Sequence, residues 1–426
     1  MLKYLKKIFK IIGPGFITGA ADDGPSGVAT YSQTGARFGF SQLWLTIFSF
    51  PFMVVIQQMC GRIGMVTGKG LASVIRTHYS RWILYFAVSL LLISNTINIG
   101  ADLGVMATST EMLMGLPFIF WLCLLTGLII TLEVFVTYKT YSKYLKYLTL
   151  SLFSYVIAAF ILKPNWGIII NHTLIPHINF SKNYILNIVA ILGTTISPYL
   201  FFWQASQEVE EEVSDGKITD IGVGKARVTQ EIVAAMNLDT IVGIIFSQGI
   251  MFFIIITTAV TLHVNGLTII ENASQAAEAL KPVAGDFAYL LFSVGIIGTG
   301  FLAIPVLAGS SAYAVAETIG IKEGLSKKSG RAPGFYMVIA ASTLIGMLIN
   351  WIGIDPFNAL YYSAALNGLS AAPLMILVIL TANNKKIMGR FVNKKFSNII
   401  GWIVVFIMSI AGLLLIFDLA KSLLVK

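Results

Sequence analysis

The sequence is poor in charge and in cysteine. Asp, Glu, Lys and Arg make up only 12% of the 426 residues, whereas 56% of the residues are apolar. A water-soluble globule cannot be built with so little polar surface, so that class is excluded. The two cysteines, Cys60 and Cys123, both lie in apolar runs, which excludes a disulfide framework and a thiolate metal cluster.

Catalytic motifs are missing as well. The sequence has no Walker loop, no nucleophile elbow and no zinc-hydrolase helix, so neither ATP-driven pumping nor intramembrane hydrolysis has the residues it needs. The four histidines are scattered over loops and segment ends, and no pair has the spacing of metal ligands inside one segment. We therefore expect neither an enzyme nor a resident cofactor.

What the sequence does contain is a series of long apolar segments separated by short charged loops. Allowing about 20 residues per crossing, this pattern predicts an all-α integral membrane protein with about eleven transmembrane helices. No loop is long enough to bury a core of its own, so a single transmembrane domain over residues 1–426 is expected. The predicted spans are 11–33, 42–61, 83–108, 116–137, 146–163, 186–207, 232–262, 286–316, 334–353, 356–383 and 399–420.

The basic residues predict an orientation. With the N-terminus inside, the alternate loops place 23 of the 29 Lys and Arg residues on the inner side and the other six outside. Inner loops carry such an excess, so we expect a multi-pass protein of the cell membrane with a cytoplasmic N-terminus and the C-terminus outside. Because the bases lie in loops, the net charge of +9 reflects topology and does not indicate nucleic-acid binding.

Two stretches rich in glycine and proline, Asp22–Gly27 and Thr194–Tyr199, interrupt apolar spans about one half-chain apart. A helix in lipid breaks at such a stretch unless the freed backbone groups meet protein, water or a ligand. Breaks at matching positions of two halves point to the substrate site of a transporter. Five spans per half predict inverted repeats over about 11–163 and 186–383, with an extra helix at about 399–420.

The same stretches carry a resemblance to a known family. The chain resembles the NRAMP divalent metal transporters in Gly13-Pro14-Gly15-Phe16, in Asp22-Asp23-Gly24-Pro25-Ser26-Gly27 and in Leu192-Gly193-Thr194-Thr195-Ile196-Ser197-Pro198. NRAMP proteins carry Asp-Pro-Gly-Asn in the first helix and Met-Pro-His in the sixth, on the LeuT-like fold of sodium-coupled amino-acid transporters. The resemblance covers nearly the whole chain and implies that fold and a divalent cation as substrate.

The side-chain ligands of the family are changed in this sequence. The resemblance places the family's metal-binding aspartate on Gly24, its asparagine on Gly27 and its methionine on Ser197. The family's backbone-carbonyl ligand falls on Thr194, where the side chain does not matter. The resemblance therefore implies a site whose carboxylate must come from elsewhere.

Asp22 and Asp23 stand directly before Gly24, and a one-residue shift would bring Asp23 to the vacated place. Two carboxylates at mid-membrane are costly unless a cation or a proton neutralises them. The alternative is that the pair only caps the second half of the broken helix, but capping needs one aspartate, so a cation role is preferred. The expected metal-site residues are Asp22, Asp23, Gly24, Gly27, Thr194 and Ser197.

Ser197 in place of methionine changes the cation that is expected. A thioether favours soft transition metals, whereas hydroxyl, carbonyl and water oxygens favour harder ions. Together with Gly27 it is also expected to enlarge the cavity, which suits a hydrated ion such as magnesium. This resembles the NRAMP-related magnesium transporters, and manganese is the alternative.

Proton coupling is expected to be weak or absent. The two family histidines of the sixth helix fall on Tyr199 and Gln204, and neither a phenol nor an amide titrates near neutral pH. Asp102 lies inside the third span and is a candidate for a second metal carboxylate or a proton acceptor. It could equally be the hydrogen-bond partner of Asn95 or Asn98.

Other functions compete with this prediction. A sodium-coupled organic-solute symporter of the same fold is disfavoured because the acidic pair would repel an anionic substrate, and a proton-coupled manganese or iron transporter of the family is a second alternative.

The acids of Glu208–Glu212, just after the sixth span, are expected to be a solvated loop flank. The expected partners are a divalent metal ion and the lipid bilayer, and no obligatory protein partner is evident.

Overall fold

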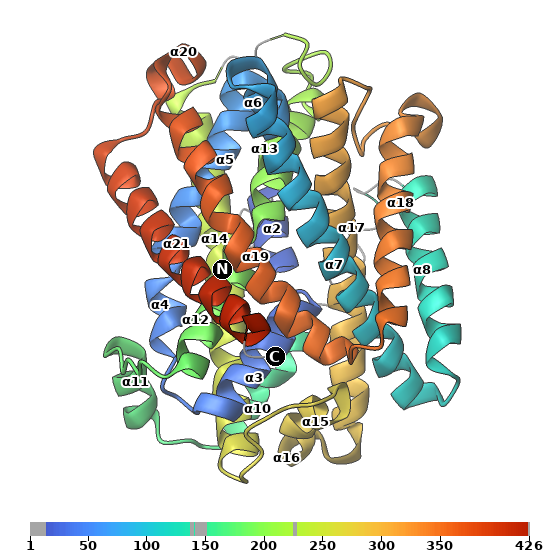
Figure 1. Cartoon of the computed structure of the whole chain (residues 1–426), viewed down its shortest axis with the longest axis vertical. Coiled ribbons are helices and arrows are strands. Elements are labelled where there is room, and N and C mark those ends of the chain that lie inside the picture. The colour runs from blue at the N-terminus through green and yellow to red at the C-terminus, as the bar shows by residue number, and fades with distance from the viewer. Residues whose placement is uncertain (1–13, 137–139, 141–150, 225–227, 425–426) are drawn as a thin grey trace, which may run out of the picture.

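The computed structural model describes residues 14–136, 140, 151–224 and 228–424, which are almost entirely helical (Figure 1). The helices of the first half are α2 (Pro14–Asp22), α3 (Pro25–Phe38), α4 (Trp44–Phe48), α5 (Phe50–Thr67), α6 (Leu71–His78), α7 (Arg81–Met114), α8 (Phe118–Phe135), α10 (Phe153–Ile161) and α11 (Trp166–Leu174). Those of the second half are α12 (Lys182–Thr195), α13 (Pro198–Ser214), α14 (Gln230–Thr258) with a π-helical end (Ala259–His263), α15 (Ala273–Ala277), α16 (Lys281–Ala284), α17 (Ala288–Ile319), α18 (Pro333–Ile349), α19 (Pro356–Asn383), α20 (Lys385–Met388) and α21 (Lys395–Leu424).

The predicted spans correspond closely to these helices. Nine stretches of the described residues are long and apolar enough to cross a membrane. The first predicted span is divided between α2 and α3, and the fifth begins at 146–150, outside the described residues, and continues as α10. The all-helical, multi-span fold is confirmed, whereas the count of eleven spans stays a prediction.

Both predicted helix breaks are present. Gly24 separates α2 from α3 in an extended conformation (φ −62°, ψ 178°), and Pro25 opens α3. Ile196 (φ −114°, ψ 54°) and Ser197 (φ −75°, ψ 133°) separate α12 from α13, which Pro198 opens. A proline in the first turn of a helix loses no hydrogen bond, because the N–H there has no partner within the helix. The two prolines therefore stop one helix and start the next.

Small residues let the broken helices approach their neighbours closely. A Cβ on Gly19 of α2 would collide with the backbone of Gly243 on α14. A Cβ on Gly193 of α12 would likewise collide with the carbonyl of Ala364 and the backbone of Gly368 on α19. Helices in membranes associate through such small-residue contacts, because lipid offers no hydrophobic drive. The halves of the broken helices are therefore held tightly in the interior.

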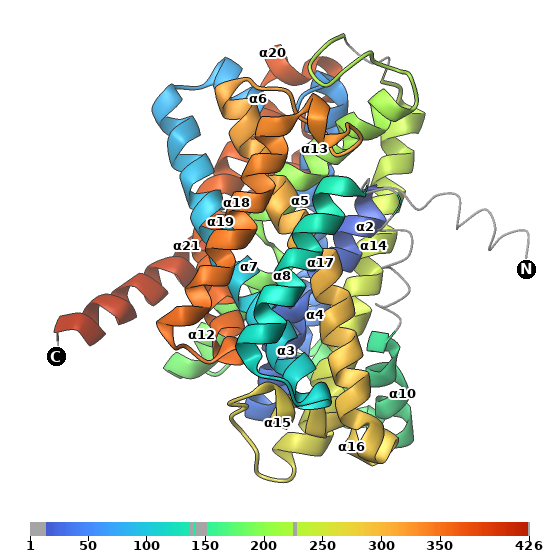
Figure 2. The same ribbon diagram turned by 90° about the vertical axis from the view of Figure 1, so that its right-hand side faces the viewer.

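The helices differ in how much of their surface other helices cover. In α17, and in α12 with α13, 78% and 83% of the most apolar stretch is buried, whereas in α8, α18 and the first part of α21 the value is 33%. Figures 1 and 2 show α8 and α18 at one side of the bundle, and α21 against α19 with its C-terminal end pointing away. The apolar outer faces of these peripheral helices suit contact with lipid.

The two ends of the bundle are formed by different short elements. The α6 end comprises α6, α20 and the segments 215–224 and 320–332, and the α11 end comprises α11, α15 and α16 (Figure 1). The N–H of Gly222 donates to Gly68 O at 2.7 Å, which fixes one of these segments beside the start of α6.

Candidate metal site

The two helix breaks lie side by side in the interior. The hydroxyl of Tyr199, in the first turn of α13, donates to the carbonyl of Ala21 at 3.4 Å, in the last turn of α2. Tyr199 is buried and lies within electrostatic range of Asp22, Asp23 and Asp102. Residues 178 positions apart in the chain therefore meet at one place, as paired breaks require.

Asp22 and Asp23 form a buried carboxylate pair at the end of α2, with 1% and 0% of their surface exposed. Both face the hydroxyl of Ser247 on α14, which lies 3.0 Å from Asp22 Oδ2 and 3.1 Å from Asp23 Oδ1. A serine hydroxyl carries one proton and can satisfy only one carboxylate at a time. Asp22 Oδ1 and Asp23 Oδ2 have no hydrogen-bond partner among the described residues. The pair therefore has space in its hydrogen-bonding shell for a cation or a proton.

The capping alternative for this pair is not what the structure shows. The N-cap of α3 is Gly24, and no side chain caps that helix. Both carboxylates are directed toward α14 through Ser247. Burying two acids away from the helix start would be costly without a positive partner, so capping does not account for them.

Asp102 on α7 approaches the same region from the other side. Its carboxylate lies beside the backbone N–H of Ser26, at the start of α3, but neither oxygen completes a hydrogen bond with a described residue. Asn95 donates to α17 at Leu307 O, and Asn98 accepts from Ser363 of α19. Neither asparagine is thus the hydrogen-bond partner considered for Asp102. In the part of the chain that the structure describes, no three His, Cys, Asp or Glu side chains are close enough to hold one metal ion together.

The second break contributes neutral oxygen atoms. The hydroxyl of Ser197 lies 2.8 Å from the carbonyls of both Gly193 and Thr194, and its single proton can go to either of them. Ser197 and Thr194 are both buried, with 1% and 2% of their surface exposed. The Thr194 carbonyl, the expected backbone ligand, therefore lies in the break and shares the proton of Ser197. The hydroxyl keeps lone pairs that a cation could use.

Gly24 and Gly27 lie in crowded surroundings. A Cβ on Gly24 would be 2.9 Å from the Cβ of Ala303 on α17, and one on Gly27 would be 3.0 Å from the carbonyl of Asp22 and 3.3 Å from the ring of Tyr31. A side chain at either position would press on its neighbours in this backbone. The expectation that Gly27 and Ser197 enlarge the cavity stays a prediction.

A chain of polar groups leads from this region toward the α6 end. Thr18 of α2 donates to the Gln204 side-chain oxygen at 2.6 Å, and the Gln204 amide donates to Glu208 at 2.8 Å. Beside them, the N–H of Gly15 donates to the carboxylate of Asp239 on α14 at 2.7 Å. Gln204 thus connects Thr18 of the first broken helix to Glu208 of α13 by hydrogen bonds. It does not lie at the breaks themselves.

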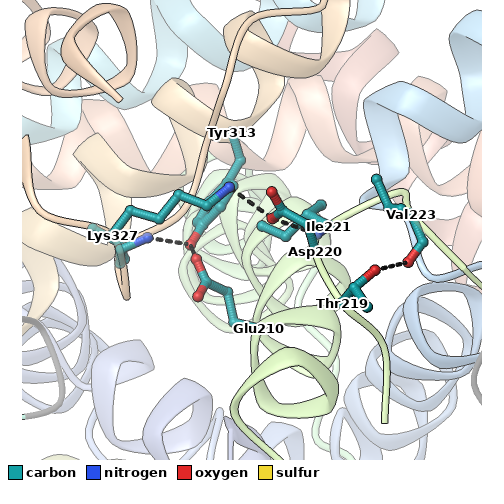
Figure 3. A network of polar contacts seen from close by, with 8 residues as sticks. Glu210, Thr219, Asp220, Ile221, Val223, Tyr313 and Lys327 are labelled. Atoms are coloured by element: carbon teal, nitrogen blue, oxygen red, sulfur yellow. Dashed lines mark hydrogen bonds and ion pairs between the residues drawn. The ribbon is translucent and has the colours of Figure 1, made fainter. Parts of the chain in front are cut away.

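The acids after the sixth predicted span are not a solvated flank. They belong to α13, and Glu208, Glu210 and Glu212 are buried, with 4%, 7% and 3% of their surface exposed. Figure 3 shows Glu210 accepting a hydrogen bond from the hydroxyl of Tyr313 on α17, at 2.7 Å. Because these acids are packed against other helices, the expectation of a solvated loop is wrong.

Two loop segments close over these acids at the α6 end. The ammonium of Lys327 lies 2.7 Å from Asp220, linking the segments 320–332 and 215–224 (Figure 3). Burial would raise the pKa of Asp220, but the hydrogen bonds from Lys327 and the Ile221 N–H and the charge of Lys327 hold it below its ordinary value. Burial, with the charges of Glu317 and Glu210, raises the pKa of Glu323 to about 10, against the opposing effect of Lys327.

A second polar cluster lies toward the α11 end of the bundle. The side-chain amide of Asn187 on α12 donates to Thr34 of α3 at 2.8 Å and to Gln42 at 2.6 Å, and its oxygen accepts from Tyr361 of α19 at 3.1 Å. One asparagine thus ties α3, α12 and α19 together. The carboxylate pair lies between this cluster and the contacts of the α6 end.

Ser247 is a residue of the candidate site that the sequence prediction missed. It lies 224 positions from Asp23, so no local pattern connects the two residues. The signal that could have drawn attention to it is the polar pair Ser247-Gln248 inside an otherwise apolar span. Sequence alone could mark that pair as unusual without showing that the serine faces the acids.

Comparison with known sequences identifies relatives along nearly the whole chain. The family model described as "Natural resistance-associated macrophage protein-like" (Nramp) matches residues 15–418. A protein of Caldanaerobacter subterraneus named "Divalent metal cation transporter MntH" is 26% identical over 96% of this chain and 94% of its own length. The protein of the same name from Deinococcus radiodurans is 23% identical over 96% of this chain and 90% of its own length.

Comparison with solved structures supports the fold. The manganese transporter of Eremococcus coleocola superposes with a TM-score of 0.75 at 16% identity, covering 96% of this chain and 86% of that one. Mhp1, a nucleobase-cation-symport-1 family transporter in a closed conformation, superposes with a TM-score of 0.61 at 12% identity, covering 95% and 91%. These similarities confirm the predicted LeuT-like architecture with broken helices.

Proposed function

The chain belongs to the Nramp family, and from this premise we propose that it moves divalent metal cations across a membrane by alternating access around the two helix breaks. The relatives along its whole length are named divalent metal cation transporters. The two halves would be inverted repeats, about 11–163 and 186–383, and would move against each other around the breaks. On this proposal the protein is a transporter and not an enzyme.

The observation that carries the proposal is the buried pair Asp22 and Asp23, which share one hydroxyl donor, from Ser247. Two carboxylates this deeply buried repel each other and are stable together only if a positive charge joins them. A divalent cation supplies two positive charges at one point. The pair is therefore suited to a dication and unsuited to an anion.

The remaining ligands on this proposal are neutral oxygens. The Thr194 carbonyl and the Ser197 hydroxyl would face the ion from the second break, and Gly24 and Gly27 would contribute only backbone. Carboxylate, carbonyl and hydroxyl oxygens suit magnesium and manganese better than soft metals. We favour magnesium, which keeps several waters when bound, over manganese, the ion of the Eremococcus transporter.

The orientation proposed places the α6 end in the cytoplasm. Described basic residues of three predicted inner loops lie there, namely Arg76 of α6, Lys327 and Lys385 of α20. Arg37 and Lys281 lie toward the opposite end, at the end of α3 and in α16. An excess of basic residues at one end supports a cytoplasmic location for that end, with the N-terminus inside and the C-terminus outside.

The experiment that tests the function is uptake by the purified full-length protein in proteoliposomes, with magnesium, manganese, calcium and alanine each supplied alone. Uptake of magnesium or manganese, absent from protein-free vesicles, is the expected result. Transport of none of the three metals under an inward gradient and an inside-negative potential would contradict the proposal.

A sodium-coupled organic-solute symporter is the second candidate, favoured only by the structural similarity to Mhp1. In such a symporter, half-helix N-termini hold an anionic substrate group. Here the end of α2 presents two carboxylates at that place, which would repel it. Sodium-dependent alanine uptake without metal uptake would favour this candidate.

A further inference from the structure

A polar cavity of about 570 Å³ opens at the α11 end, on the far side of the Asn187 cluster from the carboxylate pair. Its walls come from the last turn of α3, the first turn of α12, the π-helical end of α14 and the segment 175–181. The polar side chains that line the cavity are Arg37, Ser41, His177, Asn179, Tyr184 and His263.

The cavity is basic. Its lining contains Arg37, His177 and His263, and none of the described residues that line it is Asp or Glu. Arg37 is half-buried, and its guanidinium lies 5.6 Å from the centre of the Phe38 ring, but it forms no ion pair and no side-chain hydrogen bond within the described part of the chain. An arginine in a recess without a carboxylate partner keeps five N–H donors available to a ligand.

The two imidazoles each have one ring nitrogen left for a ligand. Nδ1 of His263 lies 2.8 Å from the carbonyl of Ala36, which can only accept, so Nδ1 is the donor and Nε2 stays free. Nε2 of His177 lies 3.1 Å from the side-chain oxygen of Asn171, which leaves Nδ1.

The walls of the cavity are fixed before a ligand binds. The buried hydroxyl of Tyr184 lies 2.9 Å from Ser41 O and 2.6 Å from His177 O, and so joins the segment that carries His177 to the segment after α3. The ring of Tyr184 also packs edge-on against Phe38, next to Arg37, with centroids 5.4 Å apart. One buried side chain therefore holds the segment that carries His177 beside the end of α3.

We propose that this cavity binds a small multi-oxygen anion, such as phosphate or a carboxylate, with the Arg37 guanidinium as its principal contact and the rings of His177 and His263 beside it. The planar fork of a guanidinium matches two oxygens of one such anion. A free metal cation is unsuited to the site, because every charged or ionisable wall group except Tyr184 is basic. This binding does not depend on whether the chain transports metals.

The test is a calorimetric titration of the full-length protein in detergent, with inorganic phosphate in one arm and citrate in the other. Saturable binding of either probe is expected, and the arm in which it occurs identifies the phosphate or the carboxylate as the preferred ligand. Arg37→Gln should weaken it about tenfold or more, because a charge-assisted contact is lost. Arg81→Gln, at an exposed arginine that begins α7, is the matched control and should bind like the parent.

A second measurement keeps the proposal testable if Arg37→Gln fails to fold. Diethyl pyrocarbonate modifies exposed imidazoles, and His177, His263 and the distant His78 are all exposed. The probe that binds should protect His177 and His263, as read by mass spectrometry, and leave His78 unprotected. Absence of binding in both arms, binding that Arg37→Gln leaves unchanged, or equal protection of His78 would each overturn the proposal.

Discussion

The two helix breaks are alike in backbone and packing but differ in charge. Each has a proline in the first turn of its second half and a glycine in close contact with a neighbouring helix. At the first break, Asp22 Oδ1 and Asp23 Oδ2 have no hydrogen-bond partner among the described residues. At the second break, the Ser197 hydroxyl lies within hydrogen-bond distance of the Gly193 and Thr194 carbonyls, and no side chain there is charged. Attraction for a cation should therefore reside in the first break, and discrimination between cations in the second.

The largest effect is expected from removing charge at the first break. Asp23→Ala should reduce metal uptake to the level of protein-free vesicles, because Asp23 stands at the break and is the preferred carboxylate ligand of the dication. Asp22→Ala should cost less, since Asp23 is adjacent to the break itself. Uptake of magnesium and manganese in proteoliposomes is the measurement.

The matched control for these variants is Glu133→Gln. Glu133 is a buried acid of α8 that lies away from both breaks, and neither of its oxygens has a hydrogen-bond partner among the described residues. Its replacement should leave uptake unchanged. Parental transport by both aspartate variants would show that the first break does not hold the ion.

A smaller effect is expected from Ser247, which connects the first break to α14. Ser247→Ala removes the donor shared by the two carboxylates, so their spacing should change and the apparent affinity for the metal should fall roughly tenfold. Ser247→Thr keeps the hydroxyl and should restore most of it. Ser342→Ala removes a buried hydroxyl whose one hydrogen bond among the described residues is to Ile339 O, on peripheral α18, and it should have no effect. Equal KM values for Ser247→Ala and Ser342→Ala would show that Ser247 does not contribute to metal binding.

The second break should change selectivity more than rate. Ser197→Met introduces a soft thioether in place of a hydroxyl, so cadmium and manganese should compete better against magnesium. Competition is measured as the inhibition of magnesium uptake by each metal. A cadmium-to-magnesium ratio that does not change would mean that the side chain at 197 does not face the ion.

The smallest change is expected in intravesicular pH, because little or no proton flux should accompany metal uptake. Moving a dication down about 100 mV is worth roughly 4.6 kcal/mol, at about 2.3 per charge, so a coupled proton is not needed energetically. Intravesicular pH should therefore stay constant during metal uptake. Acidification that follows metal entry and disappears in Asp102→Asn would instead assign proton coupling to Asp102, whose carboxylate completes no hydrogen bond with a described residue.

Much of the fold followed from local chemistry. Apolar length predicted the spans, and Pro25 and Pro198, each next to residues that leave helical geometry, predicted the breaks. The acidic pair was also evident, because charge inside an apolar span is costly whatever the fold. The crowding at Gly27 was not evident, since it depends on the carbonyl of Asp22 turning toward it after the break.

The sequence by itself determined that this chain is helical, that it crosses a membrane many times and that two carboxylates stand at a helix break, because each of these depends on neighbours in the chain. Only the tertiary structure decided which groups meet. Ser247 reaches Asp22 and Asp23 from a helix more than 200 residues away, and Arg37, His177 and His263 come from three separate segments to line one cavity. Hydrogen bonds and charges act over a few ångströms of space, so their partners are set by how helices pack and not by their order in the chain.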